Sequence, residues 1–314
     1  MNCKPIQVVI LSMVIFPLGV VFAASNSILV LTQPGIPQYQ QVLSGVKLGL
    51  SNKKFSFTVV DIEDQYLFDK ASTIDAALVL SIGTKASRLA VQVIKNRPIV
   101  FAMVLNPVEE GLVTLTPKPV KPQNQVTGVA ARISPQAYID YAKKIQPHIK
   151  KIGVLYTPQL YGDYINELSR YAKLKNIEVI HKKVASKRVF TAKFQAVIKQ
   201  NVDLYMILPD FKIYDSHAVQ YTLLNTFKAG IPCIGPSFNF VKSGALWGLT
   251  IAPQKMGEHT AQLIHRLLDT GRTIPWVYAH SHGLSLNVMT AQKLGIEIPK
   301  RVLQAEGLVT WGAD

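Results

Sequence analysis

A repeated unit constrains the fold of this chain more than any other feature: a short apolar run ends in a polar turn that begins a helix. The clearest copy spans residues 76–87, where a continuous apolar run ends at Gly83 and a helical pattern with Thr84 as its cap follows. Apolar runs without alternation are typical of strands buried on both faces. The unit recurs at an offset of 125 or 126 positions in the pairs 27–32 with 151–157 and 76–84 with 202–210, and less regularly in 98–107 with 232–237. A nearly constant offset indicates an internal repeat.

Alternating strands and helices predict βαβ units and parallel sheets, and their internal repeat predicts two similar lobes. About 290 residues follow the N-terminal segment described below, which is more than one hydrophobic core usually serves. Hydrophobic residues make up 48% of the chain, as in a globular protein. The predicted fold class is therefore α/β, with two similar lobes that each hold a parallel sheet flanked by helices.

The segments between and after the repeats predict how the lobes are joined. A proline-rich loop is predicted at 116–122, leading into a crossing segment. Further elements are predicted as a strand at 244–251, an amphipathic helix at 253–268 ended by Gly271, an edge strand at 277–288 and a short helix at 290–295. The predicted domains are a signal peptide at 1–23, an N-terminal lobe at 24–128 plus 241–271, and a C-terminal lobe at 129–240 plus 272–314.

The N-terminal segment resembles a secretory signal. Lys4 supplies a positive charge, residues 6–22 are mostly apolar, and Val21-Phe22-Ala23 fits the small-x-small cleavage rule. A retained membrane anchor is the competing interpretation, which Pro17 and Gly19 disfavour. We therefore expect an exported, periplasmic protein.

Cysteine usage agrees with simple export. Removal of the signal would take Cys3 with it and leave Cys233 alone, so no intramolecular disulfide is expected. No cysteine lies at the cleavage point, so no lipoprotein is expected. We expect Cys233 to be a small buried side chain.

The charge balance is strongly basic, with 34 Lys and Arg against 19 Asp and Glu and a formal net charge of +15. Nucleic acid is one class of partner for such a chain. The lysines are scattered, however, and no zinc-finger or RNA-recognition signature accompanies them. A solvated basic surface is the better interpretation, and no nucleic-acid partner is expected.

Polar turns at the strand ends predict a ligand site. In open α/β sheets ligands bind at the carboxyl ends of the strands, so two facing lobes would pool their turns in one cleft. Free backbone N–H groups at the start of the helix after Gly83 favour a carboxylate or another small anion. The candidate ligand-binding residues are Thr32, Gln33, Gly83, Thr84, Lys85, Asn106, Tyr156, Tyr161, Asp210, Phe211, Ser237 and Phe238.

Several short segments are weak signals singly but specific in their order and spacing. They are residues 81–87, 98–107, 125–129, 151–156, 230–232, 243–246 and 287–298, and Gly257 with its helix. In these segments the chain resembles the ABC transporter substrate-binding family that includes tryptophan- and tyrosine-import components and has the type I periplasmic binding fold. The resemblance covers essentially all of the chain after the signal segment.

The resemblance implies two lobes that are hinged by about three crossing strands and close on a ligand. It further implies that the Gly83–Thr84 turn grips the acidic end of the ligand and that Asp210 is the acidic residue of the facing turn. Asn106 stands where relatives usually have aspartate, and Lys85 stands where they usually have a small residue or proline. Because an α-amino group prefers a carboxylate partner, these departures leave open whether the ligand is a zwitterionic amino acid.

No pattern for catalysis accompanies these features. The chain has no H-E-x-x-H, no G-x-S-x-G and no G-x-x-x-x-G-K-[ST] sequence. His280 and His282 give a loose hint of metal binding without a third ligand at a suitable spacing, so neither a metal nor another cofactor is expected.

The expected function is capture of a small ligand, carboxylate-bearing and of the aromatic amino acid or related acid class, for delivery to an ABC transporter permease by a monomeric protein. The alternatives are a sensory protein that presents its closed state to a signalling receptor and an exported α/β enzyme.

Overall fold

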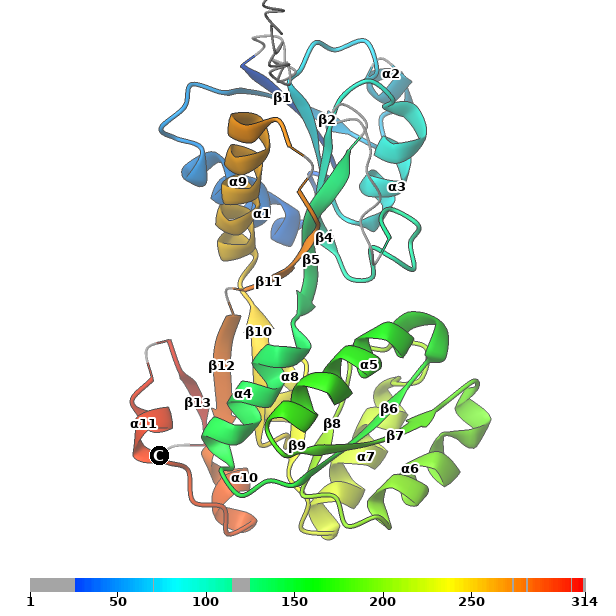
Figure 1. Ribbon diagram of the computed structural model, residues 1–314, viewed down its shortest axis with the longest axis vertical. Coiled ribbons are helices and arrows are strands. Elements are labelled where there is room, and N and C mark those ends of the chain that lie inside the picture. The colour runs from blue at the N-terminus through cyan, green and yellow to red at the C-terminus, as the bar shows by residue number, and fades with distance from the viewer. Residues whose placement is uncertain are drawn as a thin grey trace, which may run out of the picture.

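The computed structural model describes residues 26–69, 71–114, 125–272, 274–280, 282–305 and 307–312. They form two lobes that lie one above the other and are joined at a narrow waist (Figure 1). The predicted signal peptide at 1–23 and the predicted proline-rich loop at 116–122 lie outside the described residues. No helix in the described part of the chain is long and apolar enough to cross a membrane.

The N-terminal lobe is a six-stranded sheet covered on both faces. Apolar side chains of α1 (Pro37–Gly49) and α9 (Pro253–Thr270) pack on one face, and those of α3 (Thr84–Val93) pack on the other, beside the short α2 (Gln65–Asp69). The strands are β1 (Ser27–Thr32), β2 (Ser56–Asp61), β3 (Leu78–Ile82), β4 (Ile99–Val104), β5 (Val126–Ile133) and β11 (Val277–Ala279), in the order β11-β5-β4-β3-β1-β2. β1 and β3 are buried on both faces, as continuous apolar runs require.

The C-terminal lobe is a seven-stranded sheet, also covered on both faces. Its strands are β6 (Lys151–Tyr156), β7 (Glu178–Lys183), β8 (Leu204–Met206), β9 (Cys233–Gly235), β10 (Trp247–Ile251), β12 (His282–Asn287) and β13 (Val309–Trp311), in the order β13-β12-β10-β9-β8-β6-β7. Residues of α4 (Pro135–Ile145), α5 (Pro158–Leu174), α10 (Val288–Lys293) and α11 (Lys300–Leu303) pack in one core cluster. Residues of α6 (Phe190–Ile198), α7 (Ser216–Lys228) and α8 (Phe238–Lys242) pack in a second cluster.

The two sheets repeat one strand order. Five strands of the N-terminal lobe run β2-β1-β3-β4-β5, and their counterparts run β7-β6-β8-β9-β10. All these neighbours pair in parallel. The predicted fold class, two similar α/β lobes, is therefore confirmed. Cys233 is buried and free, as the sequence indicated.

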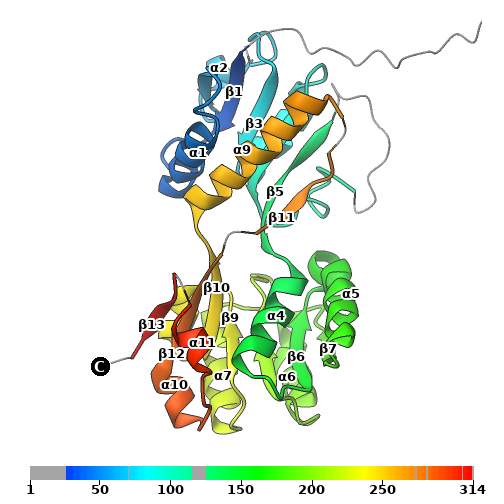
Figure 2. The same cartoon turned by 60° about the vertical axis from the view of Figure 1, so that its left-hand side comes forward.

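Within the described residues, the chain crosses the waist at the β5–α4 and β10–α9 junctions, and the consecutive strands β11 and β12 lie in different lobes (Figure 2). The sheets divide the chain differently from the predicted lobe boundaries, because β5 and β11 belong to the N-terminal sheet and β10 to the C-terminal one. The edge strand predicted at 277–288 is two strands, one in each sheet. Alternation of apolar and polar residues continues across a hinge, so it does not show which sheet a strand joins.

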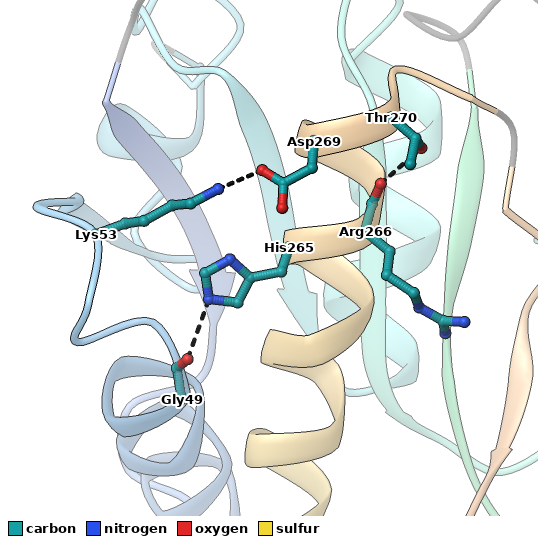
Figure 3. A network of polar contacts seen from close by, with 6 residues as sticks. All are labelled: Gly49, Lys53, His265, Arg266, Asp269 and Thr270. Carbon is teal, nitrogen blue, oxygen red and sulfur yellow. Dashed lines mark hydrogen bonds and ion pairs between the residues drawn. The ribbon is translucent and has the colours of Figure 1, made fainter.

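A close helix pair fixes the N-terminal lobe. Helix α9 follows the second crossing segment and packs tightly along α1. An added Cβ at Gly257 would lie 2.1 Å from the Val42 carbonyl oxygen. At the far end of the pair, Lys53 forms an ion pair with Asp269, and the His265 ring lies 3.2 Å from the Gly49 carbonyl oxygen (Figure 3). This pairing anchors the second crossing segment in the lobe.

Candidate functional site

The carboxyl ends of the parallel strands face the waist in both lobes. β5 and β10 each run into a crossing segment at their carboxyl ends, and the strands beside them are parallel to them. The turns after β1, β3 and β4 therefore face those after β6, β8 and β9. This is where open α/β sheets bind ligands.

A cavity of about 230 Å³ lies at this junction and has walls from both lobes and from the crossing strands. Three tyrosines from α4 and α5, all at least 95% buried, form its aromatic wall: Tyr138, Tyr161 and Tyr164. The other lining residues are Met103, Leu105, Ala131, Arg132, Ile133, Leu208, Pro209, Pro236, Leu249, Thr250 and Ile251. The cavity is thus largely apolar, with one cation.

Hydrogen bonds hold two of these tyrosines in place. The Tyr161 hydroxyl donates to the Pro209 carbonyl oxygen at 2.8 Å, and the Tyr164 hydroxyl donates to the Ile133 carbonyl oxygen at 2.9 Å. Burial raises the pKa of both phenols, so they stay neutral and keep donating. Tyr161 is the one member of the predicted site set among the residues that line this cavity.

Arg132 supplies the cation. It lies near the end of β5 and is 8% exposed. Its guanidinium carbon lies 4.5 Å from the ring centre of Tyr161 and 5.1 Å from that of Tyr164, within cation–π range. Nη2 donates to the Leu160 carbonyl oxygen at 3.2 Å, whereas Nε has no hydrogen-bond partner in the described part of the chain.

Other polar atoms around the waist also lack partners among the described residues. Thr250 Oγ1, in the cavity wall, is buried without a hydrogen bond. So are Thr32 Oγ1 at the end of β1 and Asn106 Oδ1 just after β4. Buried polar groups are nearly always paired, so these unpaired atoms mark the strand ends as places for a polar ligand or bound water.

Met103 lies in the same wall with a strained backbone. Its φ angle is +58°, and the pairing of β4 with β5 shifts register between Ala102 and Val104. A β-bulge of this kind redirects a side chain and is common next to binding sites. Here it places Met103 in the cavity lining.

The turn after β3 differs from its prediction in one respect. Gly83, with φ at +95°, occupies the cap position and Thr84 is the first residue of α3, with no side-chain cap. The predicted cap by Thr84 is therefore wrong. Ser87 takes over the local bonding, since its hydroxyl donates to the Gly83 carbonyl oxygen at 2.9 Å. The Gly83 N–H donates to Ala102, and an added Cβ at Gly83 would lie 2.4 Å from the Tyr39 hydroxyl oxygen.

The polar side chains next to this turn are bonded to a glutamate. The exposed Lys85 ammonium lies 2.7 Å from a Glu63 carboxylate oxygen, and Gln33 Nε2 donates to the same oxygen at 2.8 Å. Glu63 therefore neutralises the lysine that the sequence placed at the anion end of the ligand.

Asp210 is fully buried, and its carboxylate is bound within the C-terminal lobe. The Thr157 N–H and hydroxyl donate to its two oxygens at 2.7 and 3.0 Å, and the Lys212 N–H donates at 3.2 Å. These bonds tie the turn after β6 to the turn after β8. Tyr156, at the end of β6, is buried and packs edge-on against His181.

The remaining predicted site residues lie at the ends of β8 and β9. Phe211 is 76% exposed. Ser237 occupies the cap position of α8 without a side-chain bond, and the Phe238 ring packs edge-on against Trp311. Phe211 also lines an open groove of about 1070 Å³ on the C-terminal lobe between α7, α8, α10 and β13, a different surface from the cavity at the waist.

Sequence reasoning missed several cavity residues. Arg132 is one of these, although an arginine inside the otherwise apolar run of β5 was a signal that could have been read. Tyr138, Tyr164 and Thr250 lie in helices and a strand away from the turns on which the prediction concentrated, and the Met103 bulge has no sequence signature.

The histidines near the hinge pair with each other or with aromatic rings. His280 Nδ1 lies 2.8 Å from His259 Nε2, and His282 packs edge-on against Tyr141. In the described part of the chain no group of three or more His, Cys, Asp or Glu side chains is placed to hold a metal ion.

Comparison with known proteins adds a family. The profile of the family described as ABC transporter substrate binding protein matches residues 53–309. A tyrosine-binding protein of Clostridioides difficile strain R20291 is 28% identical over 214 residues, which are 68% of this chain and 59% of that protein. The alignment therefore spans less than two thirds of the relative's length.

Solved structures with the same fold cover most of the chain. A ligand-free, open substrate-binding protein with adhesive properties from Clostridium difficile has a TM-score of 0.68 at 19% identity, covering 92% of this chain and 99% of that one. An ABC domain from Streptococcus pneumonia in complex with L-Trp has a TM-score of 0.58 at 23% identity, covering 90% and 99%. At these identities the likeness establishes the fold.

Proposed function

Because the chain belongs to the ABC transporter substrate-binding protein family, we propose that it captures a small carboxylate-bearing aromatic solute between its lobes and delivers it to an ABC transporter permease. The family is one of solute-binding proteins rather than enzymes. Export to the periplasm through the N-terminal segment and action as a monomer are parts of the same proposal.

One observation carries this proposal: the cavity at the waist combines a wall of buried tyrosines with a single buried guanidinium. An aromatic wall favours a flat apolar ring, and a guanidinium favours a carboxylate. At about 230 Å³, the cavity is smaller than the roughly 300–1,000 Å³ typical of drug-sized ligands. A single amino acid or a related acid suits this size better than a peptide or an oligosaccharide.

The relatives support the same ligand class. One is named for binding tyrosine and another was solved with L-Trp. Among the predicted strand-end residues, Thr32 and Asn106 belong to the proposal as further ligand contacts, because their side-chain oxygens lack hydrogen-bond partners among the described residues.

A binding screen tests this function. The full mature chain is screened by thermal shift against the common amino acids, aromatic acids without an amino group, and aromatic amines, and the hits are measured by calorimetry. We expect L-tyrosine, L-tryptophan or a related aromatic acid to raise the melting temperature. If only sugars or no member of the panel bind, the proposed function is wrong.

Delivery needs a second measurement. Uptake of the bound solute into vesicles that carry the cognate permease should depend on the binding protein. Binding without any permease-dependent uptake, together with capture of a signalling receptor, would support the sensory alternative instead.

A further inference from the structure

We infer that Arg132 at the hinge, rather than the turn at Gly83 and Thr84, binds the carboxylate of the solute. This inference rests on the proposed function and deepens it, since it assigns the anionic end of the ligand to the crossing strand β5. The aromatic part of the solute then lies against the tyrosine wall.

The surroundings of Arg132 leave its charge without an ionic partner. No carboxylate of the described residues lies within 4.0 Å of the guanidinium, although the side chain is more than nine-tenths buried. Its polar partners there are one backbone carbonyl and the faces of two tyrosines. A buried charge is costly unless it is paired and hydrogen-bonded. A ligand carboxylate would supply the missing pair.

The acids that line a small recess together with Arg132 do not fill this role. They are Glu109, Asp163 and Glu167, and none of them lies within ion-pair distance of Arg132 in the described part of the chain. Partial burial raises the pKa of Glu109 more than the Arg132 charge lowers it. A carboxylate in a formed ion pair would be shifted the other way.

The competing anion site is partly closed by the protein itself. At the turn after β3, the Gly83 N–H is bonded to Ala102 and Tyr39 covers the glycine. The charge of Lys85 is matched by Glu63. The helix start still offers N–H groups, but the cation that the described residues place beside them, Lys85, is already paired.

The position of Arg132 suits a ligand that holds both lobes. Its backbone belongs to the N-terminal sheet, whereas the carbonyl and both rings that it contacts belong to α5 of the C-terminal lobe. Thr250 Oγ1, on the other crossing strand β10, has no hydrogen-bond partner among the described residues and provides a neutral hydrogen-bonding group in the same wall. A carboxylate at this point contacts the hinge itself.

A thermodynamic cycle tests the assignment. The full mature chain, Arg132→Gln and Thr84→Ala are each titrated by calorimetry with L-tyrosine, 4-hydroxyphenylpropionate and tyramine, which share the phenol ring but carry both charged groups, the carboxylate alone and the amine alone. L-Tryptophan, indole-3-propionate and tryptamine form a second set. Arg132→Lys keeps the charge and serves as a second variant, and circular dichroism checks that each variant is folded.

We expect Arg132→Gln to weaken the binding of both carboxylate ligands by about 10- to 100-fold, as the loss of a charge-assisted hydrogen bond does. The affinity for the amine should fall by no more than about twofold, and Arg132→Lys should recover part of the carboxylate affinity. Thr84→Ala should weaken the binding of all three ligands by less than about threefold. A folded Arg132→Gln variant that weakens acid and amine equally would overturn the inference, as would a selective loss of the acids in Thr84→Ala. Absence of binding by the parent chain to any acid of the two sets would instead contradict the proposed function.

Discussion

Asp210 is a buried carboxylate that the sequence predicts to contact the ligand, whereas its hydrogen bonds in the structure stabilise the fold. Three donors from two turns converge on it. Asparagine keeps one acceptor oxygen, but it replaces the other with an NH2 group and removes the charge. A buried donor then faces another donor, which costs about 1.5–3 kcal/mol. We therefore expect Asp210→Asn to lower the free energy of unfolding by that amount whether or not the ligand carries a cation, measured by urea denaturation.

Asp203 offers a matched control for this variant. It accepts two backbone N–H bonds, from Lys150 and Lys151, but it is exposed to solvent. Asp203→Asn should cost less than about 1 kcal/mol because water replaces the lost bonds. If Asp210→Asn keeps full stability and loses only solute binding, the predicted ligand-facing role of Asp210 is correct and the structural role is wrong.

The histidine pair at the hinge predicts a dependence of stability on pH. Burial first, and then the charges of His280 and Arg266, lower the pKa of His259 to about 4. Burial and Arg266 also lower the pKa of His280, and burial, with His280 and Lys144, lowers that of His282. Histidine in an unfolded chain has a pKa of about 6.5. The unfolded state thus binds more protons below pH 6.5, and stability is complete above that pH and falls as the pH drops towards 4.

For His259 the loss between pH 7 and pH 5 should be about 1–2 kcal/mol. Urea denaturation at the two pH values measures it, and His259→Gln should reduce the difference between them. His217→Gln, an exposed histidine on α7, should leave the difference unchanged. An equal pH dependence in the parent chain and in His259→Gln would contradict this account.

Single residues also show where sequence reasoning stops. Thr84 follows a glycine at a helix start, and this pattern predicts that the threonine caps the helix. In the structure Gly83, with its positive φ, is the cap residue, one position earlier. Arg132 was readable as an unusual charge in an apolar run, but its contacts come from α5, which is distant in sequence. Contacts between residues that are far apart in the chain need the tertiary fold.

At the scale of elements, the α1–α9 pair depends on glycines. An added Cβ would lie 2.1 Å from a backbone oxygen at Gly257 and 2.0 Å from one at Gly45, far inside van der Waals contact. Backbone cannot yield as a flexible side chain can, so the helices must separate. We expect Gly257→Ala to destabilise the protein by about 2–3 kcal/mol or more, measured by thermal and urea denaturation.

Gly162 provides the control for this substitution. It also lies inside a helix, α5, and an added Cβ would meet no atom within 4 Å. Gly162→Ala should be neutral or stabilising by up to about 1 kcal/mol, since alanine favours a helix. A Gly257→Ala variant as stable as Gly162→Ala would show that the contact between α1 and α9 accommodates an added methyl group, against what its geometry indicates.

Elements with a strong local pattern were well predicted. The helix that the sequence placed at 253–268 spans Pro253–Thr270, with Gly271 as its left-handed cap. The strand predicted at 277–288 was wrong because two short strands with a break at the hinge have the same alternation as one long strand. Pairing partners, not periodicity, decide such cases.

At the scale of the whole molecule, the cavity predicts closure of the lobes. Met103 and Leu105 reach it from the N-terminal lobe, and Tyr161 and Pro209 reach it from the C-terminal lobe. A solute bound there contacts both lobes. The full binding energy is gained only when the lobes are close enough for both sets of contacts to form. Short crossing segments allow the lobes to rotate about the waist without breaking either core.

Small-angle scattering measures this closure. A fully compact chain of this length has a radius of gyration of about 19 Å, and two lobes joined at a narrow waist exceed that value. Saturating solute should move the radius towards it in the parent chain. Arg132→Gln at the same solute concentration should stay near the ligand-free value, and should close only when the concentration is raised in proportion to its weaker affinity. If calorimetry detects solute binding but the radius of gyration does not change, the lobes do not close on the solute like a clamshell. The cavity would then bind solute with the lobes held in one fixed arrangement.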